Sequence, residues 1–103
     1  LKELSISDNN WKDFQSLESL GNRLEILYCI NCKVSSLEFL KSFTKLKQLY
    51  CGLNKLNSLD EIGAIKKLSL LNCRGNSIPK FKIRDFQAEN KDCKVYWKKI
   101  FLF

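Results

Sequence analysis

The chain has no histidine, no methionine, a single proline and only four glycines in 103 residues. Without histidine there is no imidazole general base, no Ser–His or Cys–His nucleophile pair and no histidine-ligated zinc. The glycines are too scattered to form a phosphate-binding loop; they are Gly21, Gly52, Gly63 and Gly75. We therefore expect a protein that is not an enzyme and that has neither a cofactor nor a bound metal.

Long apolar runs are missing as well. None approaches the ~18–20 residues that a membrane-spanning helix needs, so we expect no membrane partner. Hydrophobic residues make up 45% of the chain and charged residues 28%, which is the balance of a folded globular domain. The length favours one domain over residues 1–103.

The net charge of +7 is unevenly distributed. Residues 1–66 carry nine basic and eight acidic side chains, whereas residues 67–103 carry nine basic and three acidic ones. The C-terminal third is therefore expected to attract an acidic partner, and two classes stay open there, an acidic protein and RNA. Fifteen of the 18 basic residues are lysines, whereas recognition of phosphates and base edges more often uses arginine.

A repeat of 22 or 23 residues organises the sequence. Each unit has apolar residues at alternate positions, then an asparagine or cysteine, then apolar residues about three apart; the units begin at Leu1, Leu24, Leu46 and Leu68. The alternation predicts a short strand, and the wider spacing predicts a short helix. A single unit cannot bury its apolar edge, so the copies are expected to stack on one another.

The predicted boundaries are repeats 1–23, 24–45, 46–67 and 68–89, followed by a capping segment 90–103. Adding 22 to the fourth unit predicts apolar residues at 93 and 95, and the cysteine and valine found there predict a fifth strand. The segment 79–82, which begins with the proline, is expected to remove or displace the fourth helix. Ser16, Ser36 and Ser58 stand where helix caps are expected, and Glu61 would complete a capping box with Ser58.

This pattern resembles the leucine-rich-repeat family over roughly residues 1–97. The 22-residue period is similar to the subclass found in protein phosphatase regulatory subunits, axonemal light chains and internalins. The resemblance implies an α/β fold, a right-handed solenoid with a parallel concave sheet of four to five short strands and short helices or 3-10 turns on the convex side. It also implies binding of another macromolecule, usually a protein, on the concave face, and it brings no catalytic residue.

The inward polar positions are interpreted as structural. Asn9, Asn54 and Asn76 are expected to bond the backbone of their own and neighbouring loops. The second unit departs from the pattern, because Cys32 stands where the asparagine belongs.

The five cysteines are expected to point inward. Cys29, Cys51 and Cys73 share one strand position and should form a column, while Cys93 takes the other inward strand site. Five is an odd number, so we expect reduced, buried thiols and a cytoplasmic, reducing compartment rather than a disulfide framework. Cys29-x-x-Cys32 is a weak zinc or redox signal, and core filling explains it as well.

The outward strand positions form the candidate binding site. Read across the units, they give Glu3, Ile26, Gln48, Leu70 and Asp92, then Ser5, Tyr28, Tyr50, Asn72 and Lys94. The next two positions give Ser7, Ile30, Gly52, Arg74 and Tyr96, then Asp8, Asn31, Leu53, Gly75 and Trp97. Exposed apolar and tyrosine side chains in one patch are typical of interaction sites. The predicted protein-binding residues are Ile26, Tyr28, Ile30, Gln48, Tyr50, Leu53, Leu70, Asn72, Arg74, Tyr96 and Trp97.

Two interpretations stay open at the C-terminal end. Trp97 either joins this face or seals the end of the core. The basic and aromatic segment 94–103 is read as a terminal cap, although a nucleic-acid or acidic-peptide site would have the same composition. We expect a protein–protein interaction module, with two alternatives: an RNA- or ribonucleoprotein-associated component anchored by the basic third, and an internalin-like, host-facing bacterial protein.

Overall fold

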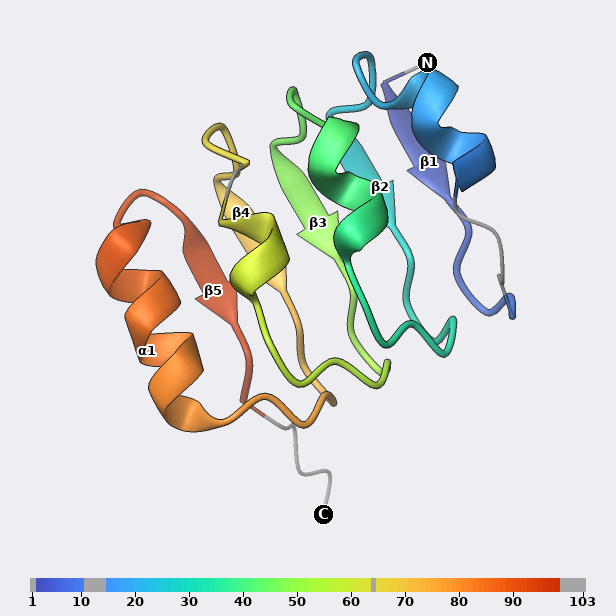
Figure 1. Ribbon diagram of the computed structural model, residues 1–103. Helices are drawn as coiled ribbons and strands as arrows, with labels where there is room; N and C mark the ends of the chain where they lie inside the picture. The colour runs from blue at the N-terminus through green and yellow to red at the C-terminus, as the bar shows by residue number, and fades with distance from the viewer. Residues whose placement is uncertain (1, 11–14, 64, 99–103) are drawn as a thin grey trace.

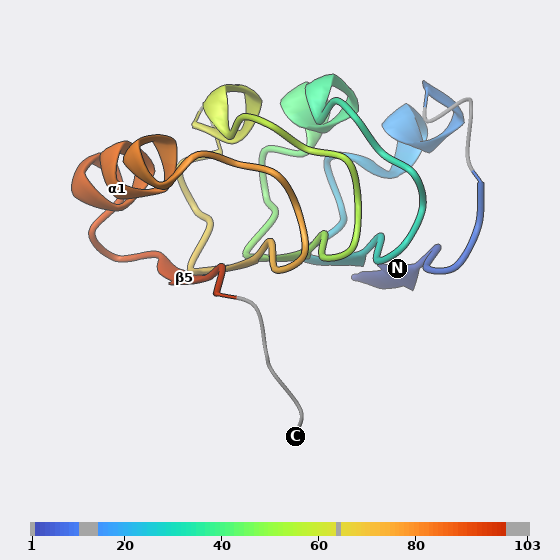
Figure 2. The same cartoon turned by 90° about the horizontal axis from the view of Figure 1, so that it is seen from below.

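The computed structural model describes residues 2–10, 15–63 and 65–98, which form two layers. One layer is a five-stranded parallel sheet in chain order, made of β1 (Glu3–Ser5), β2 (Ile26–Tyr28), β3 (Gln48–Tyr50), β4 (Leu70–Asn72) and β5 (Lys94–Tyr96). The other layer contains three 3-10 helices and one α-helix: η1 (Gln15–Leu20), η2 (Glu38–Ser42), η3 (Asp60–Ile62) and α1 (Lys80–Glu89). Figures 1 and 2 show the coils stacked side by side, with the sheet along one side and the helices along the other. The predicted strand–turn–helix repeat is confirmed.

The register of the first four strands follows the sequence period. Leu4 lies opposite Leu27, Leu27 opposite Leu49, and Leu49 opposite Leu71. The leucines at the fourth position of consecutive units therefore stack on one another. Together with leucines and isoleucines from the helical layer they form a core that is sealed between the two layers.

The fifth strand exists, but its predicted register is wrong by two residues. Leu71 lies opposite Val95, and Asn72 opposite Tyr96, which is an offset of 24 residues instead of 22. Its connection contains an α-helix of ten residues. An α-helix rises about 1.5 Å per residue against about 2.0 Å in a 3-10 helix, so it needs more residues to cross the same distance. Cys93 consequently precedes β5 and does not take the strand site opposite Leu71.

The expected loss of the fourth helix is also wrong, since α1 is the longest helix described. Pro79 immediately precedes it, with φ −60° and ψ 144°. The first turn of a helix needs no internal N–H donors, so proline is tolerated there and its fixed φ suits the chain entry. Ile83 and Phe86 lie three residues apart and are buried against the core.

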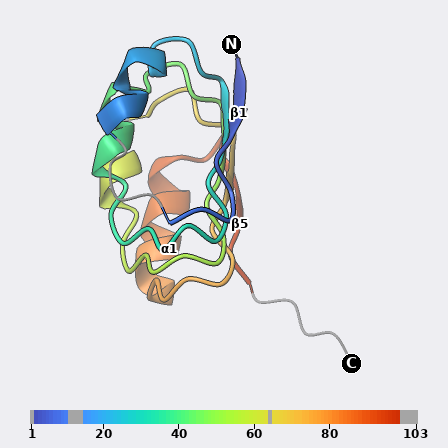
Figure 3. The same ribbon diagram turned by 90° about the vertical axis from the view of Figure 1, so that its right-hand side faces the viewer.

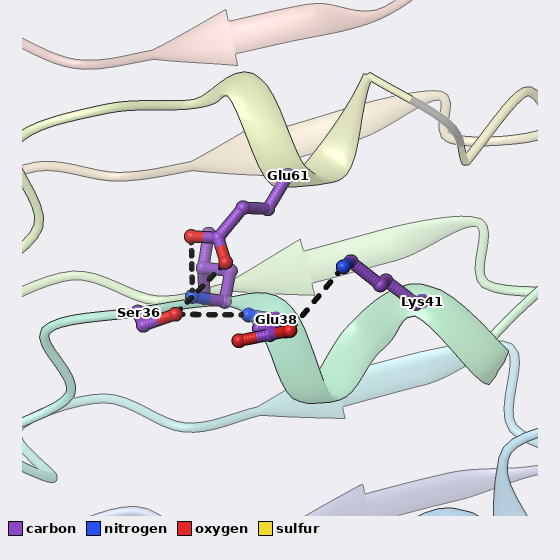
Figure 4. A network of polar contacts seen from close by, with 5 residues as sticks. Ser36, Glu38, Lys41 and Glu61 are labelled. Carbon is purple, nitrogen blue, oxygen red and sulfur yellow. Dashed lines mark hydrogen bonds and ion pairs between the residues drawn. The ribbon is translucent and has the colours of Figure 1, made fainter.

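The predicted capping box between Ser58 and Glu61 is also wrong, because Glu61 bonds to another coil. Ser58 Oγ does accept from the Asp60 N–H at 3.1 Å, and Ser36 Oγ from the Glu38 N–H at 3.2 Å. Glu61, however, reaches back to the preceding coil, as Figure 4 shows: it accepts from Ser36 Oγ at 2.8 Å and from the N–H of the next residue at 3.0 Å. It therefore ties η3 to the start of η2. Ser16 lies inside η1, and its side chain is outside the described part of the structure.

The turns that follow the strands are held by asparagine, as predicted for Asn54 and Asn76. Asn54 Oδ1 accepts from the N–H groups of Cys32 at 2.9 Å and Val34 at 3.0 Å. Its Nδ2 donates to three carbonyl oxygens, of Cys29, Cys51 and Gly52, at 2.8–3.1 Å. One buried side chain thus joins two consecutive turns, and Asn76 repeats the pattern one coil further on.

The first two units close their turns differently. Cys32, in the asparagine position, donates from Sγ to the Ile6 carbonyl at 3.0 Å. Asn9 is exposed and donates to the carbonyls of Ile6 and Ser7, both at 3.0 Å and both in its own turn. Within the described ranges, no helix has the length and apolar character needed to cross a membrane.

We predict that Asn54→Ala lowers the free energy of unfolding by about 3 kcal/mol or more, because it leaves several buried backbone groups without partners. The matched variant Asn57→Ala removes the same side chain from an exposed position and should stay within about 0.5 kcal/mol of the parent. Urea unfolding measures both variants. Equal midpoints would contradict the role given to Asn54.

Candidate functional site

Three rows of side chains cross the outer face of the sheet, on the side away from the helices. The strand register defines the first two rows, Glu3–Ile26–Gln48–Leu70–Lys94 and Ser5–Tyr28–Tyr50–Asn72–Tyr96. The third row follows the strand ends and includes Ser7, Ile30, Gly52 and Arg74. We call these three rows the outer sheet face.

The centre of the outer sheet face is a pair of stacked tyrosines. Tyr28 lies opposite Tyr50 on the neighbouring strand. Parallel strands are about 4.8 Å apart, and the two ring centroids are 4.5 Å apart with the planes 10° from parallel. The spacing of the repeat therefore produces the stack directly.

A polar side chain lies beside each of the two phenols. The Tyr50 hydroxyl donates to Gln48 Oε1 at 2.9 Å. The pKa of Tyr28 is raised, first by desolvation and then by the nearby Glu3 carboxylate. Both rings are half-buried. The pair is thus ordered before any partner arrives.

A cationic group occupies the far end of the outer sheet face. The Arg74 guanidinium lies over the Tyr96 ring, 5.3 Å from its centroid, and Tyr96 is one of three large hydrophobic residues exposed in the described structure. Lys94 lies opposite Leu70 in the first row, one alternation before Tyr96 on the same strand. The sequence predicted Lys94 to face outward in line with Asn72 but did not include it among the protein-binding residues; the shift of β5 places it in line with Leu70 instead.

The turn after each of the first four strands contains a residue with a left-handed backbone. Its φ is 61° at Asp8, 56° at Asn31, 55° at Leu53 and 76° at Gly75. Aspartate, asparagine and glycine tolerate this conformation, whereas leucine is strained in it.

Leu53 combines this strain with exposure, since 62% of its surface is accessible. The Leu53 side chain lies directly over Gly75. A Cβ atom added to Gly75 would come within 2.7 Å of Leu53 Cδ2. Leu53 thus presents an apolar side chain to solvent from a strained backbone. Strain of this kind concentrates at binding sites.

The structure brings most of the predicted site residues together. Six lie on β2–β4 and one on β5; they are Ile26, Tyr28, Gln48, Tyr50, Leu70, Asn72 and Tyr96. Three lie in the turns that follow, namely Ile30, Leu53 and Arg74. The shift of β5 corrects the position of Trp97, which aligns with the inward Cys73 and packs against the core. Trp97 therefore closes the end of the core and is not part of the outer sheet face.

The cysteines lie behind this face, inside the core. All five are free and buried. Burial raises the pKa of Cys29 and of Cys73 to about 12, and it raises the pKa of Cys51 well above its usual value and that of Cys93 as well. Among the residues that the structure describes, no group of three or more histidine, cysteine or carboxylate side chains could hold a metal ion. The thiols of the Cys29–Cys51–Cys73 column are neutral, and they fill space in the core.

We predict slow thiol labelling in the folded chain at pH 9. A pKa of about 12 leaves about one thiol in a thousand ionised at that pH, whereas about three quarters are ionised in the unfolded chain, where the cysteine pKa is about 8.5. Mass spectrometry of labelled Cys29 and Cys73, with and without urea, measures the difference, and fast labelling in the folded state would contradict the core placement. Because the folded-state pKa is raised, stability should be unaffected below about pH 9 and should fall as the pH rises toward about 12.

We also predict that Leu53→Asn raises the free energy of unfolding by up to about 1 kcal/mol, because asparagine adopts the left-handed conformation more readily. Leu53→Ala is the matched control, since it removes the apolar side chain and keeps the strain. Thermal unfolding of the two variants separates the effects. If Leu53→Asn were no more stable than Leu53→Ala, backbone strain at this turn would be disproved.

Comparisons with known proteins agree with this geometry. A family model described as "Leucine Rich repeats (2 copies)" matches residues 22–64, and no curated protein gives a significant match. An internalin from Listeria monocytogenes superposes with a TM-score of 0.79 at 21% identity, over 96% of this chain and 28% of its own. A leucine-rich-repeat protein from Leptospira interrogans superposes with a TM-score of 0.75 at 26% identity, over 92% of this chain and 25% of its own. This chain thus spans about a quarter of the length of both structures, and its repeats and fold are similar to those of leucine-rich-repeat proteins.

Proposed function

We propose that the chain is a non-enzymatic module that binds another protein through its outer sheet face, which corresponds to the concave side of a leucine-rich-repeat solenoid. The fold generally serves protein–protein interaction. The observation that carries the proposal is the Tyr28–Tyr50 stack on a face that is otherwise open to solvent.

The stack suits binding better than it suits folding. The two rings offer a large amphipathic surface, with Ile26 beside Tyr28 and Leu70 on the next strand extending it. Because the two rings already stack on each other and the Tyr50 hydroxyl is bonded to Gln48, little rotamer freedom is lost when a partner arrives. Tyrosines in such settings are frequent binding hot spots.

The charge distribution favours protein over RNA as the main partner. On β2 and β3 the outer sheet face carries only uncharged side chains, from Ile26 to Tyr50. An RNA site needs cations that follow the phosphates across the surface. Buried free thiols in the core support a reducing compartment for the module, and this argues against the host-facing alternative.

We predict that Tyr28→Ala combined with Tyr50→Ala weakens capture of the partner from the native source by ~30-fold or more, equivalent to ~2 kcal/mol. The melting temperature should stay within a few degrees, because outward side chains contribute little to the core. The matched pair Lys41→Ala with Lys66→Ala changes exposed residues at η2 and after η3 and should bind normally. Loss of capture in the lysine pair alone would move the site to the helical side.

Salt provides an independent test. Binding dominated by tyrosine and aliphatic side chains should weaken only slightly as salt rises. A log–log slope corresponding to four or more neutralised phosphates would instead support the RNA-associated alternative. Affinity titrations of the captured partner at several salt concentrations measure that slope.

A further inference from the structure

The β4–β5 end of the outer sheet face carries cations that the chain itself leaves without anionic partners. Among the described residues, neither Arg74 nor Lys94 forms a salt bridge, and the side-chain contact of the guanidinium is the face of the Tyr96 ring. Arg74 Nε is in addition buried without a hydrogen-bond partner. Unsatisfied buried donors are rare in folded proteins and call for a specific explanation.

Positive charges at the other end of the sheet are compensated. Glu25 binds Lys47 at 2.8 Å and Lys2 at 3.7 Å. In the described part of the chain, the outer sheet face has a carboxylate at this end, that of Glu3, and no cation. The unpaired positive charge is therefore concentrated at Arg74 and Lys94, beside the exposed Tyr96.

We propose that the partner presents an acidic peptide segment that lies across the strands, with a carboxylate against Arg74 next to Tyr96, within the positive field that Lys94 adds, and an apolar side chain on the Tyr28–Tyr50 stack. This inference rests on the proposed function and specifies the chemistry of the partner. The planar guanidinium matches a carboxylate with two parallel hydrogen bonds, and the aromatic ring beneath it restricts its orientation. Lys94 adds a second positive charge on the same strand as Tyr96.

The sheet spacing sets the register of such a segment. Tyr96 is two strands from Tyr50 and three from Tyr28, which corresponds to about 10–14 Å at 4.8 Å per strand. An extended peptide covers about 3.3 Å per residue. The acidic residue should therefore stand about three to five positions from the aromatic or aliphatic residue that contacts the tyrosines.

A phage-displayed library of random peptides of about 12 residues, long enough to cross the whole sheet, tests this with the full chain as bait. The baits are the parent, Arg74→Gln with Lys94→Gln, Tyr28→Ala with Tyr50→Ala, and Lys41→Gln with Lys66→Gln. The last pair removes the same charge from the helical side. Arg74 and Lys94 make no side-chain hydrogen bonds within the described residues, so unchanged melting of their variant is expected.

We expect the parent and the lysine control to select peptides with aspartate or glutamate three to five positions from an aromatic or aliphatic residue. The Arg74/Lys94 variant should bind the selected peptides at least ~10-fold more weakly. Neutralising the peptide carboxylate should weaken binding to the parent and leave binding to the variant nearly unchanged, which is the signature of a direct pair.

Other outcomes overturn the inference in distinguishable ways. Peptides selected without an acidic residue, and lost in the tyrosine variant, would refute the acidic segment and leave the proposed function standing. Peptides that bind all four baits equally would refute the outer sheet face itself. If no peptide is selected, the partner is not an extended segment, and the capture experiment decides the proposed function alone. Tighter binding of mixed-sequence single-stranded RNA than of any peptide, lost in the Arg74/Lys94 variant, would assign this end to RNA.

Discussion

The parallel register between consecutive coils is the constraint on which the rest of the structure depends. Each short strand has too few residues to be stable alone, and its backbone groups are satisfied only by the coils on either side. The turns have the same problem, and Asn54 and Asn76 solve it by bonding the turns of two coils at once. Once a unit of about 22 residues is locked in this way, every position in it lies beside its equivalent in the next coil.

That alignment explains why the inside and the outside of the sheet differ so much. Inside, equivalent positions repeat nearly the same residue, so leucines and cysteines form continuous columns with little unfilled space. Outside, equivalent positions vary freely, because solvent imposes no shape on them. The Tyr28–Tyr50 stack and the Arg74–Tyr96 contact occur in these variable rows, and the strained Leu53 lies in the turn that follows them. The stacked coils thus provide the support, and the outer rows contain the side chains that differ from one coil to the next.

The last coil shows how a local change in helix type alters the surface on the opposite layer. Replacing a 3-10 turn with α1 lengthens the unit by two residues and moves β5 along by one alternation. The shift brings Lys94 and Tyr96 into line with Leu70 and Asn72 and turns Trp97 inward. The basic end of the outer sheet face therefore depends on a helix in the other layer, and we expect changes that shorten α1 to disturb it.

The repeat alone was enough to predict the strands, their order, the cysteine column and the pairing of Tyr28 with Tyr50. Those features follow from a fixed period that any parallel stack must respect. The sequence did not determine the register of β5, because that depends on the rise per residue of a helix that Pro79 was expected to disrupt. Nor did it determine that Glu61 bonds Ser36 in the preceding coil, or that Arg74 leans over Tyr96. These contacts join residues of different coils, and the orientation of long side chains across coils is decided by tertiary packing.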